Sequence, residues 1–336
     1  MNPKTLYQIA MEKMNDSISI YLQLSEATND LTNITPNSVS NPNTRELFLA
    51  GLGLVNTEMS TEQAVEEWKR RQALKFDTEM AVTFSVYQNI RQVGALFFDQ
   101  AYEITDGFRS FSSESIYNHP YLLPIFQHLS GIFSKSALKK QIGSVSDTLI
   151  SRPASERLAK LLTERVNPNN INRGEVLQRL EGTLEGIVRD LVGRILLESI
   201  VENALKQKGI TFQRESDYKS LPGVVYNFRA DFVIPDANNS LAFIEVRKSS
   251  SRHASLYAKD KMFSAINWKG YNSNLLGVLV VDGEWTGQTL RVMANVFDYV
   301  IPIERINELA DTLNAYINGD RSKLKWLIKF SINSIS

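Results

Sequence analysis

The segment from Ala230 to Lys248 reads Ala-Asp-Phe-Val-Ile-Pro-Asp-Ala-Asn-Asn-Ser-Leu-Ala-Phe-Ile-Glu-Val-Arg-Lys. Two apolar runs, residues 230–235 and 241–248, flank a polar turn rich in Asp and Asn, and this pattern predicts two short strands joined by a turn. Each strand carries one acid among large hydrophobic side chains, Asp231 in the first and Glu245 in the second. The segment therefore predicts part of a sheet in which two carboxylates are buried near one another.

Asp231 and Glu245 together indicate a divalent metal site. A lone carboxylate in apolar surroundings is costly to ionise, so two of them near one another, followed by cations, suggest a bound Mg²⁺ that offsets their charge. The chain has no cysteine and only three histidines, which leaves mainly oxygen ligands and favours Mg²⁺ or Mn²⁺ over a structural zinc. A single acid in a strand is more often structural than catalytic, so the pairing carries this interpretation.

The residues around this segment alternate between helical and strand patterns in a regular order. A long helical pattern over 174–208, which Gly186 or Gly193 could break, is followed by a short strand over 210–214. After the acidic strands we expect a helix over 255–269, a buried strand over 275–281, a helix over 288–297, a strand over 299–303 and a closing helix over 304–317. This order predicts an α/β fold with a mixed central sheet flanked by helices.

The chain before about residue 170 is mostly helical in pattern. A Ser60/Thr61 cap with early acids and late bases predicts a helix over 61–73, and apolar residues at three- and four-residue spacing predict another over 80–102. Asn- and Ser-rich stretches at 29–43 and 110–120 predict loops. With a linker at 166–170, the sequence predicts a mainly α-helical region over 1–170 and a second domain over 171–336.

Composition excludes several classes of protein. The 336 residues are 43% hydrophobic, enough for at least one large core, and the length allows two domains. Lys and Arg number 37, as do Asp and Glu, so nucleic-acid binding would have to come from local patches. No apolar run is long enough to cross a bilayer, and the first residues begin no signal peptide. We therefore expect a cytoplasmic protein without a membrane partner, which the absence of cysteine fits.

The strand acids and the element order resemble the PD-(D/E)XK nuclease superfamily over roughly residues 190–305. In that family one strand carries an acid, the next carries an acid-x-lysine, and the preceding helix often carries a glutamate. Asp231 and Glu245 match the strand acids, and Glu198 matches the helix acid. The resemblance implies a restriction-endonuclease-like core in which Asp231 and Glu245 hold Mg²⁺ for phosphodiester hydrolysis. Arg247 departs from the pattern, because it stands where the family has lysine.

The cation of the site has several candidates. Side chains alternate along a strand, so Glu245 and Arg247 share a face, and Lys248 points the other way unless a bulge turns it inward. Arginine can stabilise charge that builds on a phosphate, but its pKa is too high for it to release a proton. A lysine of the next helix, Lys259 or Lys261, is the alternative source. We place Arg247 first and Lys248 close behind.

The helix acid is also open. The helix before the first strand is rich in acids, and Glu202 lies one turn after Glu198 on the same face, so either carboxylate could approach the metal. A solvated helix face is the alternative interpretation of both residues.

A run of hydroxyl and cationic side chains after Glu245 is the candidate DNA contact. Small hydroxyls and cations together suit phosphate oxygens, although an ordinary loop followed by a solvated helix face has the same composition. The candidate residues are Ser249, Ser250, Arg252, His253, Lys259 and Lys261. A phosphate contact or a surface position fits His253 better than a role as metal ligand.

The resemblance, the helical region and the lack of a Gly-rich phosphate loop imply a self-contained, Mg²⁺-dependent, sequence-specific double-stranded DNA endonuclease of the type II restriction class. Such an enzyme would act as a homodimer on a symmetric site and would accompany a cognate DNA methyltransferase. The helical region would carry base recognition, dimer contacts or both, because a specific site needs many contacts. Two alternatives stay open: another nuclease of the family, working in repair, recombination or defence, and a DNA-binding module with a decayed site.

Overall fold

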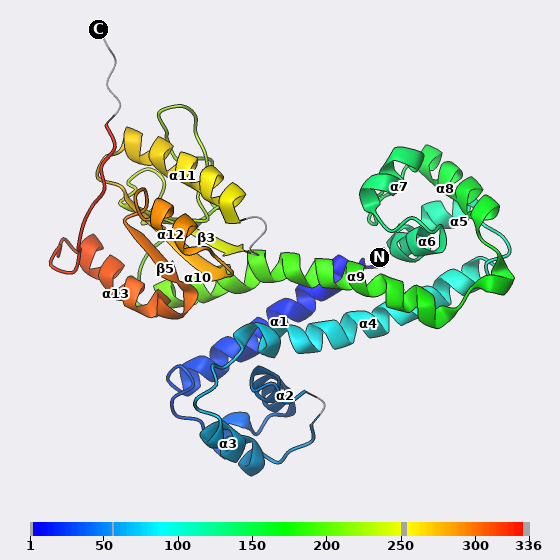
Figure 1. Ribbon diagram of the computed structural model, residues 1–336, viewed down its shortest axis with the longest axis horizontal. Coiled ribbons are helices and arrows are strands. Elements are labelled where there is room, and N and C mark those ends of the chain that lie inside the picture. Colours follow the sequence, from blue (N-terminus) through cyan, green and yellow to red (C-terminus); the bar gives the residue numbers. More distant parts are fainter. Residues whose placement is uncertain (1–2, 56, 250–253, 332–336) are drawn as a thin grey trace, which may run out of the picture. The chain divides into compact units, whose positions relative to one another are not determined.

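The computed structural model describes residues 3–55, 57–249 and 254–331, with the side chains of 254–257 excepted. The chain forms two compact units, Met1–Val192 and Gly193–Ser336 (Figure 1). The boundary lies later than the 170/171 boundary expected from the sequence. The reason is that α9 (Arg173–Leu191) packs against α4 (Thr78–Ile104) and α6 (Leu123–Leu129) of the first unit.

The first unit is built from helices in its described residues. Besides α4, α6 and α9 these are α1 (Leu6–Ala27), α2 (Pro42–Gly51), α3 (Thr61–Arg70), α5 (Ser113–Asn118), α7 (Lys135–Ile142) and α8 (Arg152–Arg165). Helix α4 packs against α1, α2 and α9, while α8 packs against α5 and α7. No helix of the described part of the chain is long and apolar enough to cross a membrane.

Local signals explain the starts of several of these helices. The side chain of Ser60 accepts a hydrogen bond from the Gln63 N–H and begins α3, as the sequence predicted. The loop predicted over 110–120 is wrong in part, because it contains α5. The Ser112 side chain caps α5 by accepting from the Ser115 N–H, so a serine of the stretch that predicts a loop is a helix cap.

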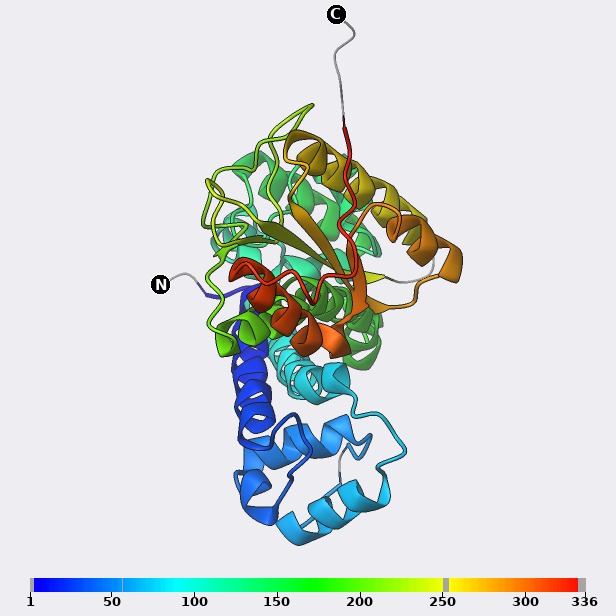
Figure 2. The ribbon, with the colours of Figure 1, turned by 90° about the vertical axis from the view of Figure 1, so that its left-hand side faces the viewer.

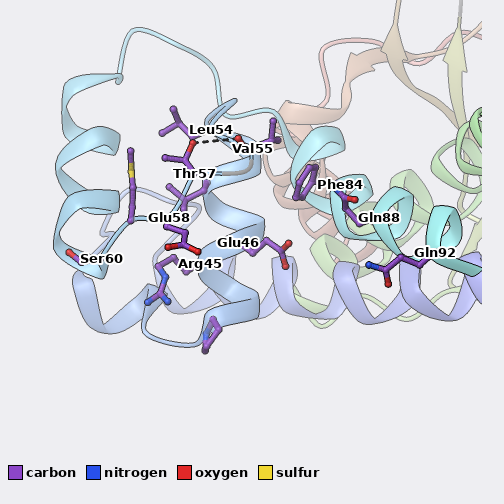
Figure 3. Close-up of a pocket in the computed structure, with 13 residues that line it drawn as sticks. Arg45, Glu46, Leu54, Val55, Thr57, Glu58, Ser60, Phe84, Gln88 and Gln92 are labelled. Carbon is purple, nitrogen blue, oxygen red and sulfur yellow. Dashed lines mark hydrogen bonds between the residues drawn. The ribbon is translucent and has the colours of Figure 1, made fainter.

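A pocket of about 910 Å³ opens on the first unit between α2, α4 and the segment that leads into α3 (Figure 3). Arg45 of α2 lines one side, and Gln88 and Gln92, one helical turn apart on α4, line another. The pocket wall therefore combines one cation and two amide side chains with the carboxylates of Glu46 and Glu58.

The described residues of the second unit form one five-stranded sheet in the order β1-β2-β3-β4-β5. The strands are β1 (Gln213–Arg214), β2 (Phe232–Ile234), β3 (Ala242–Ser249), β4 (Leu276–Gly283) and β5 (Tyr299–Pro302). Pairs β1–β2 and β2–β3 are antiparallel, whereas β3–β4 and β4–β5 are parallel. The prediction of a mixed sheet is confirmed, although the strand expected over 210–214 is only two residues long.

Helices cover both faces of this sheet (Figures 1 and 2). Helices α11 (Ala254–Tyr271) and α12 (Gly287–Met293) pack on one face, and α10 (Leu197–Gln207) and α13 (Ile306–Ile317) pack on the other. Because side chains alternate along a strand, Phe243 of β3 joins the core under α11, whereas its neighbour Ile244 joins the core under α10 and α13. The same alternation assigns a face to every polar residue of β3.

The helical pattern expected over 174–208 is interrupted at one of the two glycines named for it. Helix α9 ends at Leu191, a π-helical turn spans Val192–Leu196, and α10 begins at Leu197. The turn contains Gly193, whereas Gly186 lies inside α9. Such π-turns often accompany functional sites, and here the helix that follows carries Glu198.

Candidate active site

Strands β2 and β3 separate directly after the pair Phe232↔Ile244, and the two acids lie at this point, which we call the fork. Continuing the register would place Asp231 opposite Glu245 and then Ala230 opposite Val246, with Ala230 and Val246 as the next pair to exchange backbone hydrogen bonds. Instead, the Val246 N–H donates a 2.7 Å hydrogen bond to Oδ2 of Asp231. The Asp231 side chain thus takes the place of a strand partner, which holds its carboxylate in the fork although the residue is only 6% exposed.

Glu245 lies on the α11 face of β3 and is 1% exposed. Its Oε2 atom forms an ion pair with Lys261 of α11. Arg247, two residues later on the same face, places Nη1 3.9 Å from Oδ2 of Asp231 and Nη2 3.8 Å from Oε2 of Glu245. A cation from the strand and a cation from the helix therefore meet the same pair of acids.

Lys248 lies on the opposite face of the strand. Strand β3 pairs with β4 in continuous register from Ala242↔Leu276 to Ser249↔Gly283, so no bulge turns Lys248 inward. Its Nζ atom lies 3.5 Å from Oδ2 of Asp282. Of the four cations considered from the sequence, Arg247 and Lys261 contact the acids, whereas Lys248 pairs with Asp282 and Lys259 is exposed on α11.

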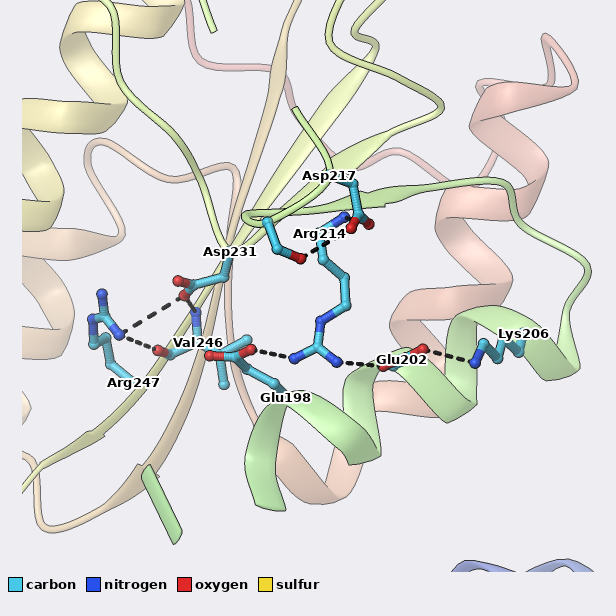
Figure 4. A network of polar contacts seen from close by, with 9 residues as sticks. Glu198, Glu202, Lys206, Arg214, Asp217, Asp231, Val246 and Arg247 are labelled. Carbon is cyan, nitrogen blue, oxygen red and sulfur yellow. Dashed lines mark hydrogen bonds and ion pairs between the residues drawn. The ribbon is translucent and has the colours of Figure 1, made fainter. Parts of the chain in front are cut away.

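Glu198 approaches the fork from α10 (Figure 4). Arg214, the last residue of β1, holds it: Nη2 lies 2.6 Å from Oε2 of Glu198, and Nη1 lies 2.8 Å from Oε2 of Glu202. Both helix acids thus share one arginine, as expected for residues one turn apart. Of the two helix acids, Glu198 is the one on which the negative charge of Asp231 acts.

The three acids affect one another electrostatically. Burial, and then the charge of Asp231, raise the pKa of Glu245 to about 8, although Lys261 and Arg247 oppose the shift. Burial and the same Asp231 charge raise the pKa of Glu198, with Arg214 opposing. Burial is the larger cause of both shifts, and the charge of Asp231 adds to each of them. A pKa that is perturbed by both burial and a specific like charge is typical of functional sites.

The candidate DNA-contact residues are only partly described. Ser249 is buried at the end of β3, where its carbonyl oxygen accepts a 2.8 Å hydrogen bond from the Glu284 N–H. Lys259 is exposed, and Lys261 is turned inward to Glu245. The remaining candidates, Ser250, Arg252 and His253, lie outside the described residues.

A second buried lysine–acid pair in the same unit shows how a purely structural pair differs. Lys269 of α11 and Asp298 are both fully buried and paired. The Asp298 carboxylate also accepts from the Gly277 N–H at 2.6 Å and from the Ile328 N–H at 2.5 Å. Among the described residues, Oε2 of Glu245 receives no hydrogen bond of good geometry beside its ion pair with Lys261. The Asp298 site is complete, whereas the Glu245 site has capacity for a further positive group.

Asp231 and Glu245 suit Mg²⁺ by donor type. No group of three or more His, Asp or Glu side chains gathers as a metal-holding cluster in the part of the chain that is described. That is compatible with Mg²⁺, which is usually held by one or two carboxylates together with water and substrate phosphates. Asp231 and Glu245 would hold the ion. Its positive charge would lower the raised pKa of Glu245.

Arg214 is a site residue that sequence reasoning missed. The available signal was a cation at the end of the strand that follows an acid-rich helix. Its contact with Glu198 depends on how α10 packs against the sheet, and no local pattern encodes that packing.

Comparison of the chain with family models, with curated proteins and with solved structures gave no match. The function is therefore argued from the chemistry of the fork and of the residues around it.

Glu245→Gln should remove a pH dependence from the stability of the metal-free protein. A carboxyl whose pKa rises on folding, here from 4.5 to about 8, keeps its proton in the folded chain after the unfolded chain has lost it. The stabilisation is complete below the lower pKa and is lost as pH rises through the higher one. Urea unfolding in EDTA provides the measurement. Between pH 5.5 and pH 8 the free energy of unfolding of wild type should fall by on the order of a few kcal/mol more than that of the variant.

Asp282→Asn is the matched control for this measurement, because it removes a carboxylate from the neighbouring strand that pairs with Lys248 outside the fork. It should track wild type across the pH range. An equal pH dependence in wild type and Glu245→Gln would show that Glu245 is ionised throughout and is fully compensated by Lys261 and Arg247.

Proposed function

We propose that this protein is a Mg²⁺-dependent endonuclease that hydrolyses phosphodiester bonds of double-stranded DNA, and that its second unit is a nuclease core of the PD-(D/E)XK type. The gathering of Asp231 and Glu245 at the fork, with Arg247 and Lys261 against them, carries this proposal. Buried carboxylates with adjoining cations provide the parts that phosphodiester hydrolysis needs: metal ligands and positive groups for the phosphate. The helix acid Glu198, on which the charge of Asp231 acts, approaches the fork from α10.

The residues of the fork divide the chemistry among them. When bound, Mg²⁺ supplies Lewis-acid activation of the phosphate and of a water molecule. Asp231 and Glu245 present the oxygen ligands, and the bond from the Val246 N–H keeps Asp231 turned into the fork. Arg247 is partly exposed beside both acids, where its guanidinium can stabilise negative charge on the phosphate. Lys261 is the one of these two cations that can release a proton, because its ammonium can be neutralised.

The first unit is proposed to recognise DNA, to form the dimer, or both. The pocket in Figure 3 supports recognition, because glutamine and arginine are the side chains that bind adenine and guanine edges in pairs of hydrogen bonds. Gln88, Gln92 and Arg45 supply such groups from two helices. Sequence-specific cutting of both strands at a symmetric site would make the enzyme a type II restriction endonuclease, acting as a homodimer and paired with a DNA methyltransferase.

A DNA-binding module that does not cleave is the second candidate. The observation that favours it is that the cations already lie against the acids: Lys261 contacts Glu245, and Arg247 stands where the family pattern has lysine. A retained, poorly compensated carboxylate pair argues against decay, since an unused buried charge destabilises a core. Cleavage itself separates the two candidates.

Asp231→Asn and Glu245→Gln should each abolish cleavage of mixed-sequence plasmid DNA in Mg²⁺, while DNA binding in Ca²⁺ remains. Loss of one metal ligand removes several kcal/mol of transition-state stabilisation, so activity should fall at least about a thousandfold. Asp282→Asn, one strand away, should stay within about threefold of wild type, a change of less than about 0.7 kcal/mol. Turnover near the wild-type rate in either fork variant would refute the assignment of the site.

Sequencing of the product ends from the wild-type reaction discriminates among the activities. Discrete fragments with common end sequences indicate restriction, and a smear indicates a nuclease without sequence preference. Retention of DNA without cutting, in Mg²⁺ and in Mn²⁺, supports the binding module.

Substitution of the three nearby cations should separate them by face. Arg247→Ala and Lys261→Ala should each lower cleavage by about a hundredfold or more, because each removes a positive group that contacts the acids. Lys248→Ala should retain most activity, since its partner is Asp282 on the other face. Single-turnover rates at saturating Mg²⁺ provide the measurement. A larger loss in Lys248→Ala than in Arg247→Ala would mean that the strand presents its other face to the phosphate.

Gln92→Ala should relax sequence preference if the pocket of the first unit reads bases. A bidentate contact contributes about 1 to 3 kcal/mol of discrimination, so the ratio of cutting at preferred and altered sites should fall roughly 5- to 150-fold. Gln100→Ala is the control, because Gln100 is exposed on the same helix and does not line the pocket. Unchanged preference in Gln88→Ala, Gln92→Ala and Arg45→Ala would place recognition elsewhere.

A further inference from the structure

At the fork, the backbone groups of Ala230 and Val246 are hydrogen-bonded to side chains. The Ala230 N–H donates to the hydroxyl oxygen of Tyr218 at 2.5 Å, and the same hydroxyl donates to the Ala230 carbonyl oxygen at 2.9 Å. On the other strand, the Val246 N–H donates to Asp231, and the Val246 carbonyl accepts from Nη1 of Arg247 at 3.1 Å. The groups that would continue the β2–β3 ladder are thus all bonded to side chains.

Tyr218 lies at the base of the loop between β1 and β2. That loop is fixed at a bridge between Leu221 and Phe228, and it is fixed again by the buried Asn267 of α11. The Asn267 side chain accepts from the Val225 N–H at 2.7 Å and donates to the Tyr226 carbonyl at 2.9 Å. The tyrosine is therefore held by a loop that is docked on the helix that carries Lys261.

The chemistry of the hydroxyl suits a double role. Burial raises the pKa of Tyr218, so the phenol keeps its proton and can donate to a carbonyl while its oxygen accepts from an N–H. Because the Tyr218 hydroxyl bonds both the N–H and the carbonyl of Ala230, Ala230 needs no hydrogen bonds from a neighbouring strand. Phenylalanine at this position would leave both groups without partners, and the nearest groups in register are those of Val246.

We propose that Tyr218 is a positioning residue for the fork: its hydroxyl withholds Ala230 from Val246, which leaves the Val246 N–H to hold the Asp231 carboxylate beside Glu245 and Arg247. The part of this inference that concerns metal binding rests on the proposed function. The effect of Tyr218 on the fork is a property of the protein alone and requires neither metal nor DNA.

Tyr218→Phe tests the proposal, since it keeps the ring and removes only the hydroxyl. A crystal structure of the metal-free variant should show Ala230 hydrogen-bonded to Val246 and Asp231 released from the Val246 N–H. Tyr316→Phe is the matched control. It removes a hydroxyl that donates to the Asn274 carbonyl at 3.1 Å, just before β4 begins at Leu276. That variant should leave the fork unchanged. An open fork in Tyr218→Phe, with Asp231 still bonded to Val246, overturns the proposal.

Asp231→Ala provides the reciprocal test. It removes the side chain that bonds Val246 but leaves both Tyr218 bonds in place, so the fork should stay open. Closure of the fork in Asp231→Ala would show that Asp231, and not Tyr218, separates the strands, and it would overturn the proposal even if Tyr218→Phe fails to fold.

Calorimetric titration with Mn²⁺ then measures the consequence for the site. Residues that orient metal ligands typically contribute about 10- to 100-fold to metal affinity, so Tyr218→Phe should weaken Mn²⁺ binding by that factor. The melting temperature should match that of Tyr316→Phe, and saturating metal should restore most of the cleavage rate. If wild-type protein neither binds Mn²⁺ nor cuts DNA, the proposed function is refuted. The crystal structures of Tyr218→Phe and Tyr316→Phe would still decide the role of Tyr218 at the fork. Undiminished Mn²⁺ affinity in Tyr218→Phe would overturn that role.

Discussion

The burial of two carboxylates at one point of a sheet is the constraint on which the second unit depends. Asp231 is 6% exposed and Glu245 is 1% exposed, so each needs partners from the protein itself. Those partners come from separate elements: a backbone N–H and Arg247 from β3, and Lys261 from α11. The strand register and the docking of α11 must therefore both be correct before the acids can be buried. This requirement ties the fold of the unit to the geometry of its candidate site.

Helix α11 carries two buried lysines, Lys261 and Lys269, and they have different roles. Lys269 lies about two helical turns after Lys261 and pairs with Asp298, which also accepts two backbone N–H bonds. That pair is fully satisfied and fixes the C-terminal part of the helix against the sheet. Because one end of α11 is fixed in this way, Lys261 is delivered to Glu245 by a rigid element. Sites built on rigid elements hold their geometry better than sites built on loops.

The sequence predicted what depends on local pattern and left open what depends on packing. The strand that follows Asp231, the strand that carries Glu245, the mixed sheet and the helix with Glu198 follow from alternation and periodicity, which are encoded within short windows. The choice among Arg247, Lys248 and Lys261 required the face of β3 and the placement of α11, so several candidates remained. Contacts made by the ends of loops and strands, at Arg214 and Tyr218, were missed because the partners are distant in sequence or involve only backbone groups. The Ser112 cap shows the converse: a local signal was present and was assigned to a loop.

The metal-free charge distribution bears on how the proposed site would work. Burial and the charge of Asp231 raise the pKa of Glu245 well above its ordinary value, although Lys261 and Arg247 oppose the shift. A divalent cation at these oxygens favours the ionised form, so its binding should release a proton from Glu245 and become tighter as pH rises. It also takes over the neutralisation that Lys261 provides in the metal-free protein. Arg247 at the position where the resembled family has lysine is compatible with the proposed catalysis, because Lys261 from the neighbouring helix pairs with Glu245.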